Sequence, residues 1–217
     1  MYLPAQTEET RLDEIHRVIK EHPFGILVTQ AGGMLDANHI PFEFEPGEDG
    51  PGQLTAHVAR ANSIWQALKS GDEVLVIFRG GDAYISPTWY PSKHELHRQV
   101  PTWNYQVVHA HGVITIQDDE RFVRGMVARL TRTHEATAGN EKPWKMTDSE
   151  PEFIDALLKA IVGIEIRITS LVAKSKLGKH KDVRDIEGPA DALKARHETE
   201  ISCAMAQAAA QKKGAAA

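Results

Sequence analysis

With 217 residues, of which 41% are hydrophobic, the chain has the composition of a folded, water-soluble protein of one large or two small domains. Its longest apolar runs, such as Val74 to Phe78, are too short to cross a bilayer, so a membrane span is excluded. The formal net charge of -5 does not support a surface coated with phosphate-binding lysines, although a local basic patch stays open.

The N-terminus lacks the basic region and apolar stretch of a secretory signal, so we expect a cytoplasmic location. The single cysteine, Cys203, cannot form an internal disulfide and lies in a polar, alanine-rich tail. We assign it no catalytic role.

The first part of the chain predicts a helix and a hairpin. Leu12, Ile15 and Ile19 recur at helical spacing before Pro23, which predicts an amphipathic helix over about 8–21. Residues 24–29 and 35–44 are rich in strand formers, and the glycines at 32 and 33 predict the turn between them. The acidic residues 46–52 then predict a flexible loop.

The middle of the chain predicts further short strands. Apolar residues alternate over 54–58, and Asn62 is predicted to cap a short helix that ends at Gly71. Residues 74–78 and 83–86 are predicted to pair across a turn at Gly80 and Gly81. The polar, irregular segment 87–101 carries aromatic residues, and such a loop inside a compact domain is more often functional than idle.

The last part predicts a long strand over 103–116 and a helix opened by Asp118 or Asp119. Ser149 and Glu152 form a capping-box pattern for a helix that reaches about residue 160, and residues 164–168 alternate as a one-sided strand. From Pro189 onward the alanine-rich sequence predicts a terminal helix with a frayed tip, because the low-complexity Ala-Ala-Ala end has little to bury. We therefore expect an α+β, mainly β protein: an antiparallel barrel flanked by helices.

The densest cluster of unusual residues spans 82–95 and 100–105. Aromatic rings, hydroxyls and a lysine suit a planar ligand with a charged tail, because the aromatics cover the ring while the polar groups hold its oxygens. An ordinary structured loop is the alternative, since tryptophan and tyrosine are common packing residues. The candidate ligand-binding residues are Tyr84, Ser86, Trp89, Lys93, Thr102, Trp103 and Asn104.

Two other segments carry weaker signals. Residues 57–62 are predicted to connect a strand to the start of a helix, where free backbone N–H groups favour binding of an anion. A capped helix with a solvated arginine explains the same residues equally well. Residues 36–42 indicate an edge strand, whose free backbone groups suit the polar rim of a ring, as they suit an ordinary barrel edge. The candidates here are His57, Arg60 and Asn62, and Asn38, His39, Ile40 and Pro41.

Histidines raise the question of a metal, because His109 and His111 share one strand face and His94 and His97 are spaced by three. No carboxylate or cysteine stands at a recognisable third-ligand spacing, so we predict no metal site, while haem ligation by one histidine stays open. The sequence contains no nucleophile elbow, phosphate-binding glycine loop or dinucleotide fingerprint, and no catalytic residue is assigned.

Taken together with residues 1–4, the three segments resemble the PaiB family of FMN-binding negative transcriptional regulators. The resemblance continues through Pro143-Trp144 and residues 160–166, and covers the chain to about Leu177. It implies a split β-barrel related to flavin reductases and pyridoxamine-phosphate oxidases, paired as a homodimer with FMN near the subunit interface. We expect residues 1–175 to form the FMN-binding domain and residues 176–217 to form a basic segment and an alanine-rich helix.

The residues Lys174-Ser175-Lys176-Leu177 are followed by Gly178-Lys179-His180, where the family usually has Ser-Gln-Asn. No helix-turn-helix is visible, and direct DNA binding by the basic stretch 174–184 has no support from the net charge. Three functions stay open: an FMN-binding regulator, a flavin-dependent oxidoreductase and a haem-binding protein. We expect Arg60 and Lys93 to hold the FMN phosphate, helped by Asn62, Ser86 and Thr102.

Overall fold

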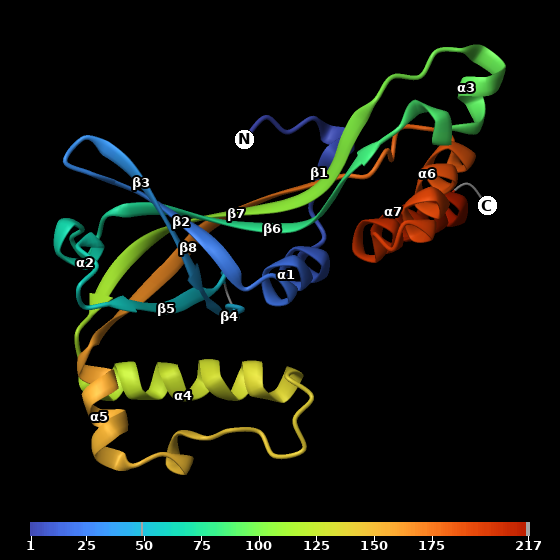
Figure 1. Cartoon of the computed structure of the whole chain (residues 1–217). Coiled ribbons are helices and arrows are strands. Elements are labelled where there is room, and N and C mark those ends of the chain that lie inside the picture. The colour runs from blue at the N-terminus through green and yellow to red at the C-terminus, as the bar shows by residue number, and fades with distance from the viewer. Residues whose placement is uncertain (49, 216–217) are drawn as a thin grey trace. The chain divides into compact units, whose positions relative to one another are not determined.

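The computed structural model describes residues 1–48 and 50–215. Its strands form one sheet in the order β3-β2-β6-β7-β8-β5-β4, with β1 paired to β8 (Figure 1). The registered pairs are antiparallel, and the order ends at β3 and β4 without closing. The predicted class, an antiparallel, mainly β fold with flanking helices, is confirmed, with an open sheet rather than a closed barrel.

The strands are β1 (Glu8–Glu9), β2 (Phe24–Ala31), β3 (Met34–Pro41), β4 (Glu43–Glu45), β5 (Gln53–Ala59), β6 (Glu73–Ile85), β7 (Thr102–Gln117) and β8 (Ile161–Lys176). The α-helices are α1 (Leu12–Glu21), α2 (Ile64–Ala67), α3 (Pro91–Leu96), α4 (Glu120–Thr137), α5 (Pro151–Lys159), α6 (Val183–Ala195) and α7 (Thr199–Gly214). Short 3-10 turns cover Ala5–Thr7, Pro87–Trp89 and Met146–Asp148. No helix in the described part of the chain is long and apolar enough to cross a membrane.

The predicted turn at Gly80 and Gly81 is wrong, because β6 runs unbroken through both glycines. Neither has the positive φ that a tight glycine turn requires. The missing side chains instead permit close packing: the backbone N–H of Gly81 donates to Glu200 at 2.7 Å, and a Cβ at Gly80 would stand 3.3 Å from Gln106. The glycines therefore make room for a neighbour rather than reverse the chain.

Three other local predictions differ from the structure: a helix start, a helix cap and an irregular segment. The first helix begins at Leu12 rather than near residue 8, because Glu8 and Glu9 pair with β8. The predicted capping box at Ser149 does not form: α5 begins at Pro151 after Glu150, which makes no side-chain cap. The segment 87–101 contains a 3-10 turn and helix α3, so it is less irregular than predicted. In the predicted loop 46–52, residue 49 lies outside the described residues.

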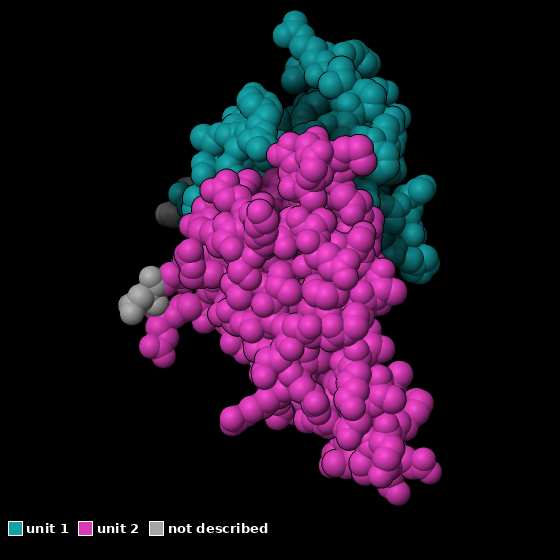
Figure 2. Space-filling view, turned by 90° about the vertical axis from the view of Figure 1, so that its left-hand side faces the viewer, with its two compact units in different colours: residues 1–18, 79–108, 172–217 teal, residues 19–78, 109–171 magenta. Residues whose placement is uncertain are grey.

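The chain divides into two compact units, shown in different colours in Figure 2. Unit 1 comprises residues 1–18, 79–108 and 172–217, and unit 2 comprises residues 19–78 and 109–171. Strands β6, β7 and β8 each contribute one part to either unit. The predicted domain boundary after residue 175 stays a prediction.

Unit 2 contains strands β2 to β5 and one part each of β6, β7 and β8. Its buried strand residues include Leu27, Leu54 and Val76, which are fully excluded from solvent. Asn62, just after β5, donates to Asn38 of β3 at 2.8 Å, so a side-chain bond joins regions near opposite ends of the strand order. Helix α4 begins where the carboxylate of Asp119 accepts from the N–H of Phe122 at 2.7 Å, as predicted for one of the two aspartates.

Unit 1 contains helices α6 and α7, which pack against each other (Figure 1). The predicted alanine-rich terminal helix is present as α7, and one side of it is buried. Met205, Ala208 and Ala209 of α7 are buried in one cluster with Ile186 and Leu193 of α6. Alanine side chains permit this, because their small size lets two helices approach closely. Residues 216–217, where a frayed tip was predicted, lie outside the described residues.

A glycine in α6 gives a test of how tightly unit 1 is packed. A Cβ on Gly188 would stand 2.4 Å from the carbonyl oxygen of Trp89, whereas a Cβ on Gly125 of α4 would meet only Arg129, at 3.9 Å. We expect Gly188→Ala to lower the free energy of unfolding by about 1–3 kcal/mol through overpacking. Gly125→Ala should raise it by about 0.5–1 kcal/mol, because alanine favours the helix. Urea unfolding of both variants measures the difference, and equal effects would contradict the close contact.

Candidate functional site

One face of the strands in unit 1 exposes aromatic rings. Tyr84 of β6 and Trp103 of β7 meet edge to face, with ring centroids 6.1 Å apart and ring planes at 72°. Tyr84 is 47% exposed and Trp103 is 55% exposed. Large aromatic side chains this exposed on a sheet are typical of surfaces that bind a ligand or a partner.

Two lysines of β8 contact this part of β7. The ammonium group of Lys176 donates to the hydroxyl of Thr102 at 2.6 Å and to the carbonyl oxygen of Trp103 at 2.8 Å. Lys174 is only 8% exposed and lies over the rings of Tyr2 and Tyr105, at 5.6 and 5.5 Å from their centroids. We call Tyr84, Trp103, Tyr105, Lys174 and Lys176 the aromatic–lysine face; Thr102, which alternates with Trp103 in β7, contacts it through Lys176.

Lys174 and Lys176 were not predicted as site residues, because they belong to the basic stretch 174–184, which is typical of a solvated surface. A usable signal was present: Lys174 and Lys176 are spaced by two in a strand, so their side chains point to the same face of the sheet. Of the predicted residues, Tyr84 and Trp103 belong to the aromatic–lysine face, and Thr102 contacts it through its bond to Lys176.

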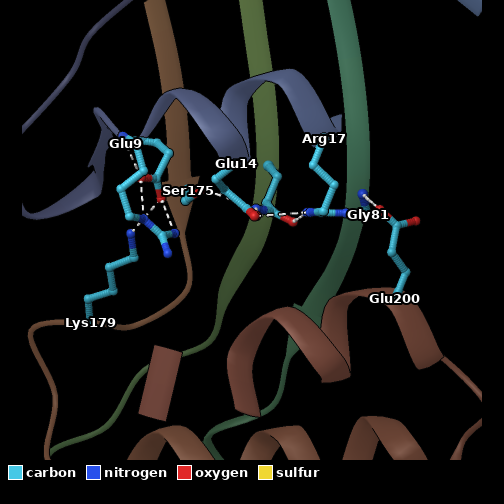
Figure 3. Close-up of polar contacts among 9 residues, drawn as sticks. Glu9, Glu14, Arg17, Gly81, Ser175, Lys179 and Glu200 are labelled. Atoms are coloured by element: carbon cyan, nitrogen blue, oxygen red, sulfur yellow. Dashed lines mark hydrogen bonds and ion pairs between the residues drawn. The ribbon is translucent and has the colours of Figure 1, made fainter. Parts of the chain in front are cut away.

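The opposite face of these strands carries a buried polar network (Figure 3). Gln106 donates to Glu14 at 2.8 Å and to Ser175 at 3.1 Å, and Arg17 donates to Glu14 at 2.8 Å. The hydrogen bond from Arg17 lowers the pKa of Glu14, although burial opposes this. Asn104, a predicted cofactor residue, is buried on this side and donates to the sulfur of Met205 at 3.3 Å, away from Trp103.

The remaining predicted residues of unit 1 make local contacts. Ser86 accepts from the N–H of Thr88 at 3.4 Å and so caps the 3-10 turn. Trp89 lies near the guanidinium of Arg196, 5.9 Å from the ring centroid. Lys93 is partly buried in α3. The roles of Ser86, Trp89 and Lys93 in cofactor binding stay predictions.

In unit 2, Arg60 makes a dense set of bonds. It donates to the carboxylate of Asp118, with one bond of 2.9 Å, and to the carbonyl oxygens of Lys159 at 2.7 Å and Ile161 at 3.1 Å. The guanidinium lies 5.6 Å from the centroid of the Trp65 ring. The hydrogen bond from Arg60 lowers the pKa of Asp118. Asp118 was predicted only as an alternative helix cap, and its pairing with Arg60 is a tertiary contact that the sequence did not indicate.

The edge-strand segment and the helix-start segment do come together in unit 2. The side-chain amide of Asn62 donates to Asn38, and its oxygen accepts from the N–H of Ile64 at 3.0 Å. His39 lies beside Phe24, with ring centroids 6.3 Å apart. Ile40 and Pro41 are partly buried at the end of β3.

His57 lies on the face of β5 that α4 covers. It pairs with Gly163 of β8, where a Cβ would stand 2.9 Å from the ring of Phe122. Burial lowers the pKa of His57, so the imidazole is neutral at physiological pH. Its Nδ1 atom is buried and has no hydrogen-bond partner among the described residues, which leaves a polar atom for a ligand or water to satisfy.

The three predicted segments are therefore divided: two meet in unit 2, and the third lies in unit 1. That all three contribute to one FMN site stays a prediction. Among the described residues, no three histidine, cysteine, aspartate or glutamate side chains are placed to hold a metal ion. The rings of His109 and His111 lie 6.5 Å apart.

Comparison with known proteins decides the family. The family model described as "Putative FMN-binding domain" matches residues 1–170. The chain belongs to this family. Its relative in Bacillus subtilis named "Protease synthase and sporulation protein PAI 2" is 31% identical over 185 residues, covering 85% of each chain. The predicted membership of the PaiB family of FMN-binding domains is confirmed.

Two solved structures share the fold of this family member. An FAD- and haem-binding protein of Mycobacterium smegmatis is 13% identical, with a TM-score of 0.52 over 79% of this chain and 74% of that chain. A flavocytochrome of Azotobacter vinelandii is 11% identical, with a TM-score of 0.52 over 79% of this chain and 70% of that chain. At such identities the likeness shows the fold alone, and it supports the predicted split-barrel architecture.

Proposed function

We propose that this FMN-binding protein holds the flavin ring on the aromatic–lysine face of unit 1. The observation that carries the proposal is the exposed ring pair Tyr84 and Trp103, with the ammonium of Lys176 bonded to the backbone carbonyl of Trp103. The isoalloxazine ring is planar and apolar with a polar rim, so aromatic side chains can cover it while a cation and a hydroxyl contact its edge. The residues present therefore fit the cofactor.

Bound FMN supplies one-electron or hydride chemistry, which the protein can only tune. In this proposal Trp103 and Tyr84 remove one side of the ring from water. Lys176 provides positive charge, which favours negative charge on a bound flavin or on its phosphate. Its hydrogen bonds to Thr102 and to the carbonyl of Trp103 fix the position of that charge.

We also propose that the protein is a homodimer. Within residues 1–48 and 50–215, β3 pairs only with β2, which leaves an eight-residue edge strand unprotected. Phe24, Met34 and Leu35 of this hairpin are 63%, 76% and 75% exposed. An exposed apolar edge promotes association with another chain, and a second copy can cover it in a two-fold dimer.

For the biological role we propose a cytoplasmic FMN-binding regulator of the PaiB type. We propose further that its basic stretch 174–184 does not bind DNA. The cations of this stretch are engaged within unit 1: Lys179 pairs with Glu9 at 3.0 Å, and Arg184 pairs with Glu95. Lys181 lies 4.5 Å from the centroid of the Tyr90 ring. These pairings leave less positive charge for a phosphate backbone. A flavin-dependent oxidoreductase and a haem protein are the alternatives.

An absorption spectrum of the purified protein separates the cofactor alternatives, because flavin bands and a haem Soret band are distinct. Titration of the apoprotein with FMN should quench flavin fluorescence at micromolar concentration. Light scattering should give twice the 24.0 kDa chain mass. The absence of quenching would refute FMN binding, and a monomeric mass over a tenfold concentration range would refute the dimer.

The prediction that Arg60 holds the FMN phosphate gains a sharper test from its pairing with Asp118. A phosphate would have to replace the carboxylate of Asp118, so the two anions would compete for one guanidinium. We expect Arg60→Ala to weaken FMN about tenfold more than riboflavin, which has no phosphate. Asp118→Asn should instead strengthen FMN and leave riboflavin unchanged. If Arg60→Ala weakens FMN and riboflavin binding equally, with the fold intact by circular dichroism, Arg60 stabilises the structure around the site and does not bind the phosphate.

A further inference from the structure

A groove in unit 2 lies outside the segments predicted to bind FMN. It is formed between α4 and the chain that returns alongside α4 toward α5 (Figure 1). The volume of the groove is about 520 Å³. This volume is within the range of small-molecule sites. Pro143 and Trp144, which the sequence analysis singled out but the proposed flavin site does not use, form part of its wall.

The walls of the groove are mainly apolar. Ala128 and Ala136 of α4 face the groove, and Pro143, Trp144 and Met146 line the returning segment. The Trp144 side chain is 40% exposed, so part of its indole is open to an occupant. The two alanines leave the space that larger helix residues would fill. An apolar, flat or extended molecular body fits between such walls.

Charged groups at the groove favour an anion. Arg132 and Lys145 both line it, and within residues 1–48 and 50–215 neither the guanidinium of Arg132 nor the ammonium of Lys145 donates a hydrogen bond or forms an ion pair. The backbone N–H of Lys145 donates to Asp148 at 2.9 Å. The one carboxylate in the lining, Glu135, accepts from the backbone N–H of Trp144 at 2.9 Å and so holds the wall in place. Two cations thus face one carboxylate that already has a partner, which leaves the groove positive.

We propose that this groove binds a small organic anion: a carboxylate with an aromatic or aliphatic body. The body packs against Trp144 and Met146, and the carboxylate lies beside Arg132 and Lys145. An entirely apolar ligand would leave both cations without an acceptor, and an inorganic anion would leave the apolar walls exposed. None of the residues that line the groove belongs to the aromatic–lysine face, so the proposed anion site and the proposed FMN site use different side chains.

The test uses the FMN-saturated full chain and two probes of the same shape, 2-naphthoate and the uncharged 2-naphthamide. Isothermal titration calorimetry should show that naphthoate binds at least about fivefold more tightly than the amide, as expected for partly exposed ionic contacts. The double variant Arg132→Gln/Lys145→Gln should abolish this preference. Arg121→Gln, an exposed arginine on the same helix but outside the groove, should preserve it.

Filling the groove gives a second, independent readout. Ala128→Trp should abolish binding of both probes, and Ala136→Phe serves the same purpose if the first variant does not fold. Failure of naphthoate to bind at millimolar concentration would overturn the proposal. So would equal binding of acid and amide, or binding that Ala128→Trp leaves unchanged.

Discussion

Trp103→Ala is expected to weaken FMN binding by about 10- to 100-fold, as alanine substitution of a stacking aromatic does for other planar rings. Trp103 is more exposed than its ring partner Tyr84, and its removal takes away the larger surface on which the flavin is proposed to lie. Trp103→Phe should lose much less, because phenylalanine still presents an aromatic face. Fluorescence titration with FMN measures both variants.

Trp144→Ala is the matched control, since Trp144 is also partly exposed but lies in the groove of unit 2. It should leave FMN affinity unchanged. Loss of FMN binding in the Trp144 variant but not in the Trp103 variant would move the flavin away from the aromatic–lysine face. Lys176→Gln is a further test. If the Trp103 ring supplies most of the contact with the flavin, Lys176→Gln should weaken FMN binding less than Trp103→Ala does.

Glu9→Gln is expected to destabilise the protein by about 2–4 kcal/mol at pH 7, as the loss of a buried charge pair does. The Glu9 side chain is only 4% exposed, and it accepts two bonds of 2.8 Å from Arg11 and one of 3.0 Å from Lys179 (Figure 3). Burial alone would raise the pKa of Glu9, but these hydrogen bonds lower it to about 2. The charged form is therefore strongly favoured in the folded protein.

The pH dependence of this effect follows from the sign of the shift. Because the pKa of Glu9 is about 2 in the folded protein and 4.5 as its ordinary value, its contribution is complete above about pH 5 and is lost as the pH falls toward 2. The difference in unfolding free energy between the wild type and Glu9→Gln should shrink over the same range. Glu8→Gln, the exposed neighbour, is the control and should have little effect. A difference that stays constant from pH 7 to pH 3 would contradict the assignment.

The same cluster shows what the unusual residues 178–180 do in this chain. Lys179 reaches Glu9, and its carbonyl oxygen accepts from Lys212 of α7 at 3.0 Å, while the carbonyl of Lys181 accepts from Lys212 at 2.6 Å. The short segment that holds residues 179 and 181 therefore contacts both the N-terminal strand β1 and the end of α7. Glu9→Gln removes the carboxylate that Lys179 contacts, so we expect it to weaken the contact between β1 and this segment.

Local patterns were sufficient for most elements. The alternating residues of β5, the long strand β7 and the helix opened by Asp119 were predicted because spacing and capping act over a few residues. The wrong turn at Gly80 and Gly81 has a long-range cause. Gly80 and Gly81 have the composition of a turn, yet the space they leave for Gln106 and Glu200 depends on residues far away in the chain.

The site residues divide in the same way. The sequence by itself determined the antiparallel class and the PaiB membership, because these depend on local periodicity and on shared residue identities. It also named Tyr84 and Trp103 as candidates, and their role in binding stays a prediction. Only the tertiary structure decided that Lys176 lies beside Trp103, that Asp118 neutralises Arg60 and that Asn104 points to the opposite face. The physical reason is that partners of charged and polar side chains are selected across strands and helices, over distances in sequence that no local pattern encodes.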